Sequence, residues 1–301
     1  MIKSFDEVLQ KVKSNGIKKV AVAVAQDEPV LEAIRDARNA GIAEAILVGD
    51  KEKIEACAKV VGLDLNGIEI INEPNGPMAA KKAVELVSSG KADMVMKGLI
   101  DTASFLRAVL DKEKGLRTGK VLSHVAVFDI PALQRIIVLT DAAMNIAPDL
   151  MTKKQILENG VGIAKAIGME MPKVACVAAV EVVNPDMQPT LDAAALSKMN
   201  DRGQIKGCIV DGPFAIDNAL SEEAAKHKGI NSPVAGKADV ILVPNIETGN
   251  VMYKTLTYTS NAKNGGILAG AAAPVILTSR ADSPESKLYS IALASLVAAA
   301  K

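Results

Sequence analysis

The sequence predicts an α/β protein with two lobes, each a three-layer domain whose helices cover a mostly parallel sheet, and a cleft between the lobes. Three observations lead to this prediction. Short apolar runs rich in β-branched residues alternate with longer amphipathic stretches along the chain. The composition is 49% hydrophobic but only 2% aromatic, which indicates an aliphatic core of the kind found in alternating βα proteins. A chain of 301 residues is also long enough for two lobes.

The first part of the chain predicts a regular alternation of helices and strands. Ser4 and Glu7 form a capping box before a short amphipathic helix, which stops near Asn15-Gly16. The strands, which are short apolar runs, are predicted at residues 19–25, 45–48, 68–71 and 92–96. The helices, most of which are followed by a glycine, are predicted at residues 27–40, 50–61, 76–89 and 101–110.

Two apolar strands in the middle of the chain interrupt this alternation. They are predicted at residues 121–128 and 135–139, and Asp129-Ile130-Pro131 supply the turn between them. So short a connection cannot make a parallel crossover. We therefore expect the two strands to pair antiparallel.

A second alternation of helices and strands fills the rest of the chain. Its strands are predicted at residues 173–179, 207–210, 238–243, 267–270 and 275–277. Its helices are predicted at residues 153–167, 191–200, 218–227, 248–261 and 284–300. The strand over residues 238–243 ends at Pro244, because proline cannot donate a hydrogen bond to a central ladder. The chain shows no internal repeat and no low-complexity linker, so we expect two packed lobes.

Charge and cysteine content narrow the class of protein. Lys plus Arg number 35 and Asp plus Glu number 35, so the zero net charge gives no electrostatic reason to expect nucleic acid or a membrane as a partner. Cys57, Cys176 and Cys208 are odd in number and widely spaced, which argues against a disulfide framework and a zinc site. With no segment of signal-peptide type and no run of membrane-spanning length, we expect a cytoplasmic protein.

Polar residues crowd the end of the strand that Pro244 closes. Asn245, Glu247, Asn250 and Lys254 follow it within ten positions, at the carboxyl end of a strand where open α/β sheets bind their ligands. The alternative is an ordinary βα turn with Glu247 in the first turn of the next helix. We interpret these four residues as candidate ligand-binding residues.

A second candidate lies where the segment from Lys97 to Leu110 enters its helix at Asp101 or Thr102. Thr102 and the backbone amides of a helix start can hold an anion, and Arg107 would strengthen that binding. The alternative is a capped helix with a solvated arginine.

A third candidate is Ser279-Arg280, at the end of a strand and before a helix that begins with proline. The guanidinium of Arg280 can bind a phosphate or an acyl phosphate through two hydrogen bonds, and Ser279 can donate one more. The alternative is an arginine that pairs with a carboxylate on the surface.

Four segments of the chain resemble one known family. The run PVAGKADVILVPNIETGNVMYK, residues 233–254, resembles the signature of the phosphate acetyltransferase and phosphate butyryltransferase family, in which a similar SPVAGKA, PN, E-x-GN and YK series recurs. KGLIDTASFLRAVL, TDAAMNIAPDL and PVILTSRA resemble the helix start, the strand exit and the Ser-Arg strand of the same family. The resemblance covers nearly the whole chain and is strongest over residues 207–280 and 97–146.

The resemblance implies an activity and its substrates. A short-chain acyl-CoA and inorganic phosphate would give an acyl phosphate and free CoA by direct attack in a ternary complex, with no cofactor and no metal. The tract over residues 180–194 lacks the Ser/Thr/Gly-rich strand exit of the acetyl enzymes, which favours the butyryl branch. We also expect a homo-oligomer built on a dimer.

The resemblance implies a finer fold as well, similar to that of isocitrate and isopropylmalate dehydrogenases. In this fold the last helix crosses back to complete the first domain. The predicted domains are therefore residues 1–129 with 284–301, and residues 130–283, which carry much of the acyl phosphate and CoA site.

The resemblance also implies a role for each candidate site residue. The catalytic residues would be Ser279, Arg280 and Asp282. The phosphate or acyl phosphate ligands would be Thr102, Arg107, Asn145 and Asn250. The residues that contact CoA or line the cleft would be Lys97, Asp141, Asn245, Glu247, Lys254 and Glu285. Acetyl enzymes of the family place an Asp six residues after the Arg, where this chain has Ser286, so the base that takes the thiol proton stays open between Asp282 and Glu285, with Asp141 as a further possibility.

Three other functions compete with this prediction. The first is a phosphate acetyltransferase or an acyltransferase that uses acyl carrier protein, which would have the same fold but a different substrate. A two-lobed NAD-dependent decarboxylating dehydrogenase would need a metal held by clustered aspartates, for which the spacing is absent, as is a G-x-G-x-x-G motif. A noncatalytic two-lobed protein that binds a small anion is the third.

Overall fold

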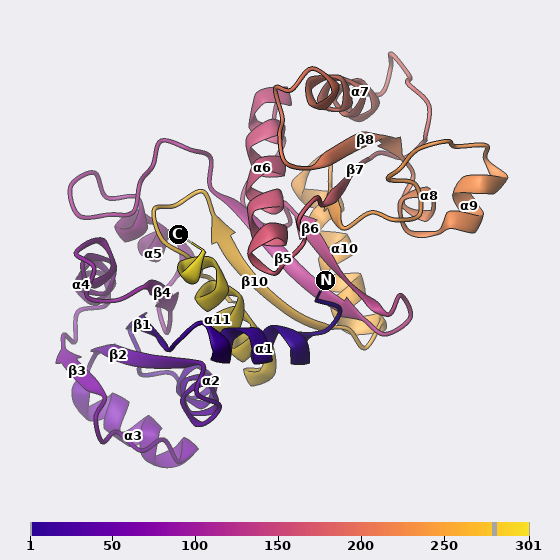
Figure 1. The fold of residues 1–301 in the computed structure, drawn as a ribbon. Coiled ribbons are helices and arrows are strands. Elements are labelled where there is room, and N and C mark those ends of the chain that lie inside the picture. Colours follow the sequence, from indigo (N-terminus) through magenta and orange to yellow (C-terminus); the bar gives the residue numbers. More distant parts are fainter. Residues whose placement is uncertain (1, 279–281, 301) are drawn as a thin grey trace. The chain divides into compact units, whose positions relative to one another are not determined.

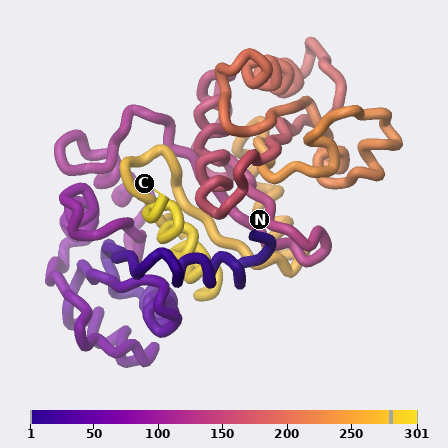
Figure 2. The backbone as a smooth tube through the Cα atoms, viewed as in Figure 1, coloured from indigo at the N-terminus to yellow at the C-terminus, as the bar shows by residue number. Residues whose placement is uncertain are grey.

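The computed structural model of the chain describes residues 2–278 and 282–300. It divides into two compact units, drawn in Figures 1 and 2. Unit 1 comprises Met1–Ser4 and Val121–Asn264, and unit 2 comprises Phe5–Lys120 and Gly265–Lys301. The predicted domains have their boundaries at residues 129/130 and 283/284 instead. In the structure the whole antiparallel hairpin predicted in the middle of the chain belongs to unit 1.

Unit 2 is an α/β unit with a mostly parallel sheet. Its helices are α1 (Phe5–Ser14), α2 (Glu28–Asn39), α3 (Lys51–Val61), α4 (Gly76–Ser88), α5 (Thr102–Val109) and α11 (Pro284–Ala299). Its strands are β1 (Lys18–Ala23), β2 (Ala43–Gly49), β3 (Glu69–Asn72), β4 (Met94–Lys97), β10 (Lys263–Ala269) and β11 (Val275–Ile276), and β10 crosses from unit 1 into unit 2.

The strands of unit 2 lie in the order β3-β2-β1-β4-β11-β10. The pairs from β3 to β11 are parallel, and β10 pairs antiparallel with β11. Helices α1, α2, α3 and α11 pack in one group, whereas α4 packs on α5 and on β1. The last helix, α11, packs on α1, α2 and β4 and so belongs to the same unit as the first βα series.

The helices of unit 2 start and stop where the sequence supplies caps. Asp50 and Asp101 accept hydrogen bonds from the backbone N–H groups of Lys53 at 3.3 Å and of Ser104 at 2.8 Å. These bonds satisfy N–H groups that have no partner inside their own helix. Gly62 ends α3 in the left-handed conformation with φ at 69°, which a glycine adopts without strain.

Unit 1 is a second α/β unit. Its helices are α6 (Leu150–Ala166), α7 (Gln188–Asp201), α8 (Ile216–Leu220), α9 (Glu222–His227) and α10 (Ile246–Thr259). Its strands are β5 (Ser123–Ile130), β6 (Arg135–Thr140), β7 (Lys173–Val177), β8 (Ile209–Phe214) and β9 (Val240–Leu242), in the order β5-β6-β9-β7-β8. The predicted antiparallel hairpin is confirmed, with Phe128 opposite Ile137, and the other pairs are parallel.

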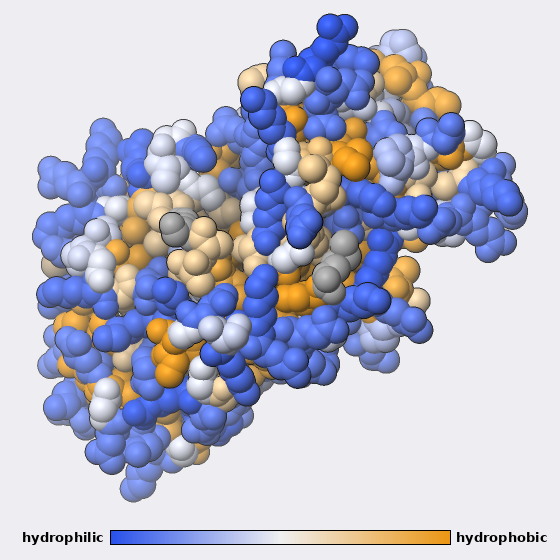
Figure 3. Space-filling model, viewed as in Figure 1, coloured by the Kyte–Doolittle hydropathy of each residue, from blue (hydrophilic) through white to orange (hydrophobic). Residues whose placement is uncertain are grey.

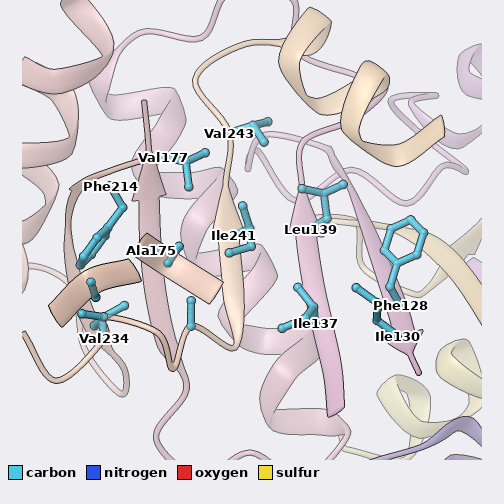
Figure 4. Close-up of a cluster of buried hydrophobic side chains, with 14 of the residues drawn as sticks. Phe128, Ile130, Ile137, Leu139, Ala175, Val177, Phe214, Val234, Ile241 and Val243 are labelled. Atoms are coloured by element: carbon cyan, nitrogen blue, oxygen red, sulfur yellow. The ribbon is translucent and has the colours of Figure 1, made fainter. Parts of the chain in front are cut away.

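The core of unit 1 is aliphatic around two phenylalanines, Phe128 and Phe214 (Figure 4). Side chains of β5, β6, β7 and β9, among them Ile137, Leu139 and Ile241, point toward one another in this cluster. Because these side chains come from adjacent strands, their burial holds the strands of unit 1 in register.

Most predicted elements are shifted by a few residues at their ends, and three differ in a more informative way. The helix expected over residues 218–227 is two helices, because Ser221 is extended and its hydroxyl caps α9 by accepting from the N–H of Ala224. β8 does not stop at Val210 but runs on to Phe214. β10 begins at Lys263 rather than at Ile267, and its first four residues are polar or glycine, so they give no apolar signal in the sequence.

Hydrophilic residues cover most of the surface seen in Figure 3, with apolar side chains in smaller areas between them. Among the helices that the structure describes, none combines the length and the apolarity needed to cross a membrane.

Candidate functional site

A pocket of about 230 Å³ lies within unit 2. The described residues that line it are Asp27, Pro29, Val30, Lys97, Gly98, Leu99, Thr278 and Lys287. These residues lie at or after the carboxyl ends of the parallel strands β1, β4 and β11, except for Lys287, which comes from α11. The carboxyl edge of a parallel sheet is where α/β proteins bind their ligands.

Glycine lets the backbone on one side of this pocket pack closely. Gly98 follows the last residue of β4, and its N–H donates to the carbonyl of Ala23 at 2.8 Å. A Cβ atom at Gly98 would lie 2.2 Å from the carbonyl oxygen of Val24. Only glycine therefore allows β4 to leave the sheet so close to β1, which places Lys97 at the pocket.

Two lysines bring positive charge to the pocket. Lys97 is 7% exposed and its ammonium donates to the carbonyl of Gly98 at 3.2 Å. Lys287 is 2% exposed, and its ammonium donates to the backbone carbonyl of Asp282. Burial lowers the pKa of Lys287, while the charges of Asp282 and Asp27 act in the opposite direction. The pocket thus combines two ammonium groups with the carboxylate of Asp27.

The predicted residues of α5 do not line this pocket. Thr102 and Arg107 are both exposed, and the helix start is capped by Asp101. Hydrogen bonds from Ser104, and to a lesser degree the charge of Arg107, lower the pKa of Asp101. The sequence left two interpretations of this helix start open, an anion-binding site and an ordinary capped helix with an exposed arginine. The local structure is the second of these.

The residues around the start of α11 have different surroundings. Ser279 and Arg280 lie outside the residues that the structure describes. Asp282 is half-buried beside Lys287. Glu285 is exposed, and its carboxylate accepts a hydrogen bond from the hydroxyl of Tyr289 at 2.7 Å. Of the two candidate bases, Asp282 is the one that lies next to a lysine of the pocket.

A second group of predicted residues lies in unit 1, after β6. Asp141 is 3% exposed and accepts five hydrogen bonds, from the backbone N–H groups of His124, Ala143, Met144 and Asn145 and from the side-chain amide of Asn145, at 2.6 to 3.1 Å. Its carboxylate therefore ties the exit of β6 to the start of β5.

Two predicted asparagines support the same loop. The amide of Asn145 also donates to the carbonyl of Leu122 at 2.8 Å. The amide of Asn250, on α10, donates to the carbonyl of Ala142 at 3.2 Å. The structure thus brings Asp141, Asn145 and Asn250 together, with their side chains engaged by the backbone of the loop.

The other predicted residues of unit 1 lie on α10. Asn245 is its cap and accepts from the N–H of Thr248 at 3.0 Å and from its hydroxyl at 2.7 Å. Glu247 and Lys254 are exposed. β6 and β9 are parallel neighbours, so the loop at Asp141 and the start of α10 share one edge of the sheet.

Gly249 allows α10 to approach the loop at Asp141. A Cβ atom there would lie 2.4 Å from the backbone carbonyl oxygen of Asp141 and 2.9 Å from the Cα atom of Ala142. We expect Gly249→Ala to lower the free energy of unfolding by about 1–3 kcal/mol, because the backbone must move to accept the methyl group. Thermal and urea unfolding measure this loss.

Gly162 on α6 supplies the matched control. Nothing lies within 4 Å of a Cβ atom built at Gly162, so Gly162→Ala should leave stability equal or raise it by about 1 kcal/mol. Equal melting temperatures for the two variants would contradict the close approach at Gly249.

Sequence reasoning missed Lys287 and Thr278, which line the pocket, and it used Asp27 only to mark a helix start. One signal for Lys287 was present. It is the last charged residue before Lys301 in an otherwise Ala-rich and apolar helix. A single lysine in such a helix either lies on the face that solvent reaches or is buried because it belongs to a binding site.

Comparisons with known proteins agree with the fold. The family model described as phosphate acetyl/butaryl transferase matches residues 4–81 and 76–295. The chain is 67% identical to a phosphate butyryltransferase from Clostridium acetobutylicum, over 100% of both chains. It is 47% identical to a phosphate acetyltransferase from Thermotoga maritima, over 97% of this chain and 99% of that protein. A crystal structure of a branched-chain phosphotransacylase from Enterococcus faecalis V583 is similar with a TM-score of 0.82 and 33% identity, covering 94% of this chain and 99% of that one.

Proposed function

The chain belongs to the phosphate acetyl/butaryl transferase family, and from this premise we propose that it transfers a butyryl group reversibly between coenzyme A and inorganic phosphate. One observation carries the proposal, the full-length identity to a phosphate butyryltransferase. This identity exceeds that to a phosphate acetyltransferase, so butyryl is preferred to acetyl.

The reaction needs no covalent bond to the enzyme. A phosphate oxygen attacks the thioester carbonyl, the carbon–sulfur bond breaks, and CoA leaves as its thiol. In reverse, the thiolate attacks the carbonyl of butyryl phosphate and phosphate leaves. The protein must hold the phosphate, stabilise the negative charge of the tetrahedral intermediate and exchange a proton with the thiol.

We assign these tasks to the Ser-Arg segment and to residues of the pocket of unit 2. Arg280 and Ser279 hold the phosphate and the developing oxyanion, because a guanidinium and a hydroxyl are strong donors to such oxygens. Lys97 adds positive charge from the pocket. The other predicted ligands stay predictions: Thr102, Arg107, Asn145 and Asn250 for phosphate, and Asp141, Asn245, Glu247, Lys254 and Glu285 for CoA.

An assay of thiol release tests the proposal. Acetyl-CoA, butyryl-CoA and octanoyl-CoA are compared, each with and without inorganic phosphate. We expect fast release from butyryl-CoA that requires phosphate and yields butyryl phosphate. Preference for acetyl-CoA would make the protein a phosphate acetyltransferase, and release without phosphate would make it a thioesterase. Inactivity with every CoA thioester, together with activity on an acyl carrier protein thioester, would support the acyl carrier protein alternative.

Asp282 is our choice for the group that takes the thiol proton, because it lies in the loop directly after Arg280 and beside Lys287. A free thiol has a pKa of about 8.5 and is mostly protonated at neutral pH. We expect Asp282→Asn to slow butyryl-CoA synthesis at neutral pH much more than in alkaline buffer, where solvent removes the proton. Rates over this pH range measure the difference.

Two results would change the role of Asp282. An equal loss at both pH values would assign Asp282 to positioning. Full activity at both would leave Glu285 or Asp141 as the base.

The proposed chemistry uses no metal and no redox cofactor. Prolonged treatment with EDTA followed by gel filtration should therefore leave turnover unchanged, because side-chain cations supply the positive charge. Loss of activity that magnesium restores would contradict this expectation.

The proposal also covers the compartment, the oligomeric state and the finer fold of the enzyme. We place it in the cytoplasm, as a homo-oligomer built on a dimer, with a fold similar to that of isocitrate and isopropylmalate dehydrogenases. Three widely spaced cysteines support a reducing compartment. Light scattering of the purified protein tests the oligomeric state.

A further inference from the structure

Helix α10 of unit 1 (Figure 1) buries little of its own surface. Of the 14 residues of this helix, Gly249 is the only buried one. Met252, Tyr253 and Leu256 pack on the apolar core of unit 1 and are half-buried. These residues form the inner face of α10, and the outer face is exposed.

The outer face of α10 carries two large apolar side chains. Val251 is 65% exposed and Tyr258 is 72% exposed. Two helical turns separate them, so they lie within about 20° of one line along the helix. Thr248 and Thr255 are exposed on the same face. The four residues are spaced by three, four and three positions, which is the spacing of a helix face that packs on another helix.

The charged residues beside this stripe make the face complementary to itself. Glu247 precedes Val251 by four residues and Lys254 follows it by three, so both lie on the same flank, about 40° and 60° from Val251. Both are exposed. A two-fold axis that crosses the helix at Val251 reverses the helix direction and sets each flank against itself. Glu247 of one copy then lies opposite the partner's Lys254, within about 1.5 Å along the helix axis, and the pair occurs twice.

The other flank matches in the same way. Thr248 precedes Val251 by three residues and Thr255 follows it by four, on the side away from Glu247. The same axis sets Thr248 against the partner's Thr255, and Val251 against the partner's Val251. Apolar, hydroxyl and oppositely charged side chains therefore meet groups of matching chemistry when a second copy of the helix packs on this face.

We propose that the chain forms a homodimer through the outer face of α10, with the two helices antiparallel about a two-fold axis at Val251. Glu247 and Lys254 make two ion pairs across this interface, and Val251 and Tyr258 form its apolar part. The inference goes beyond the proposed function, because it gives the expected homo-oligomer a surface and does not depend on which acyl group is transferred. It assigns Glu247 and Lys254 to association rather than to contact with CoA, and the test separates these roles.

Sedimentation velocity of the full-length chain, over a series of concentrations, measures the association. We expect the unmodified protein to form dimers or assemblies of dimers. Glu247→Lys and Lys254→Glu should each raise the dissociation constant of the dimer by about tenfold or more, because each replaces two attractions with two repulsions. Glu170→Lys, at an exposed glutamate of the same unit outside α10, is the control and should associate like the unmodified protein.

A mixture of the two charge variants is the most discriminating sample. When Glu247→Lys and Lys254→Glu are combined in equal amounts, opposite charges again face each other in both ion pairs of a mixed dimer. Association should therefore recover to within about threefold of the unmodified protein. Mixing repairs neither a damaged fold nor a lost contact with CoA.

Val251→Cys tests the position of the axis independently. Because the axis sets this residue against its own copy, mild oxidation should link two chains through a disulfide. Met171→Cys, at a side chain that is 55% exposed in the same unit, is the matched control. The unmodified protein, which keeps Cys57, Cys176 and Cys208, measures the background. Non-reducing electrophoresis gives the linked fraction.

Four outcomes would overturn the proposal. They are a monomeric unmodified protein, charge variants that associate like the control, a mixture that does not recover, and a Val251→Cys variant that links no faster than Met171→Cys. Charge variants that bind CoA more weakly in calorimetry but associate normally would return Glu247 and Lys254 to the CoA site. A protein that associates as proposed but transfers no butyryl group would refute the proposed reaction and support this interface.

Discussion

Arg280→Ala is expected to reduce phosphate-dependent turnover of butyryl-CoA by about 100-fold or more, with the fold intact. Loss of a single donor to the developing oxyanion costs about that much in other enzymes, and an arginine that also clamps phosphate contributes to substrate binding. We therefore expect both a lower kcat and a higher KM for phosphate. Steady-state kinetics and a thermal melt measure these effects.

Arg202→Ala is the matched control for Arg280→Ala. Arg202 is an exposed arginine at the end of α7, outside every group of candidate residues, so its loss should leave turnover unchanged. Turnover of Arg280→Ala within twofold of the control would remove Arg280 from the site. A much lower melting temperature would make its role structural.

Asp141→Ala should lower the free energy of unfolding by about 3 kcal/mol or more, because the five hydrogen bonds to its buried carboxylate include four from backbone N–H groups. The variant leaves these donors without their acceptor at the exit of β6. Urea unfolding of the full-length chain measures the loss. Asp186→Ala, at an exposed aspartate of the same unit, is the control and should change stability by less than about 0.5 kcal/mol.

The outcome of Asp141→Ala also separates two roles for this residue. Stability close to that of the control, combined with a large loss of turnover, would support the prediction that Asp141 contacts CoA. A loss of stability, with activity retained in the folded fraction, would restrict Asp141 to support of the loop.

The sequence predicts the order and type of most elements because each buried strand is a separate apolar run with turn residues on both sides. The antiparallel pairing of β5 and β6 follows from the length of a single turn. The break at Ser221 could not be predicted in the same way. A serine between Ala219-Leu220 and Glu222-Glu223 is compatible with a continuous helix, whereas in the structure it is extended and caps α9.

The residues of the candidate site also differ in how well the sequence predicts them. Lys97 could be predicted because it ends a strand, and strand ends are where α/β sheets bind ligands. The signal for Lys287 was too weak to predict its place, since the first turns of a helix commonly hold charged residues and the sequence does not say which face of α11 is buried. Asn245 and Asp141 were predicted to bind a ligand because they are polar residues at strand ends. In the structure, Asn245 caps a helix and Asp141 accepts hydrogen bonds within its loop, so these local roles explain part of the pattern. Such bonds use the same residue types as ligand binding.

The discontinuous path of unit 2 has a consequence for biosynthesis. Residues 121–264 are synthesised between the two segments of unit 2, so the long segment of unit 1 is complete before β11 and α11 exist. Until then, α1 and α2 lack the helix that packs on them, and β4 lacks β11 on one edge. An unpaired strand edge beside uncovered apolar surface invites association with other chains. During synthesis on the ribosome, unit 2 therefore stays incomplete for longer than unit 1 and needs chaperones for longer.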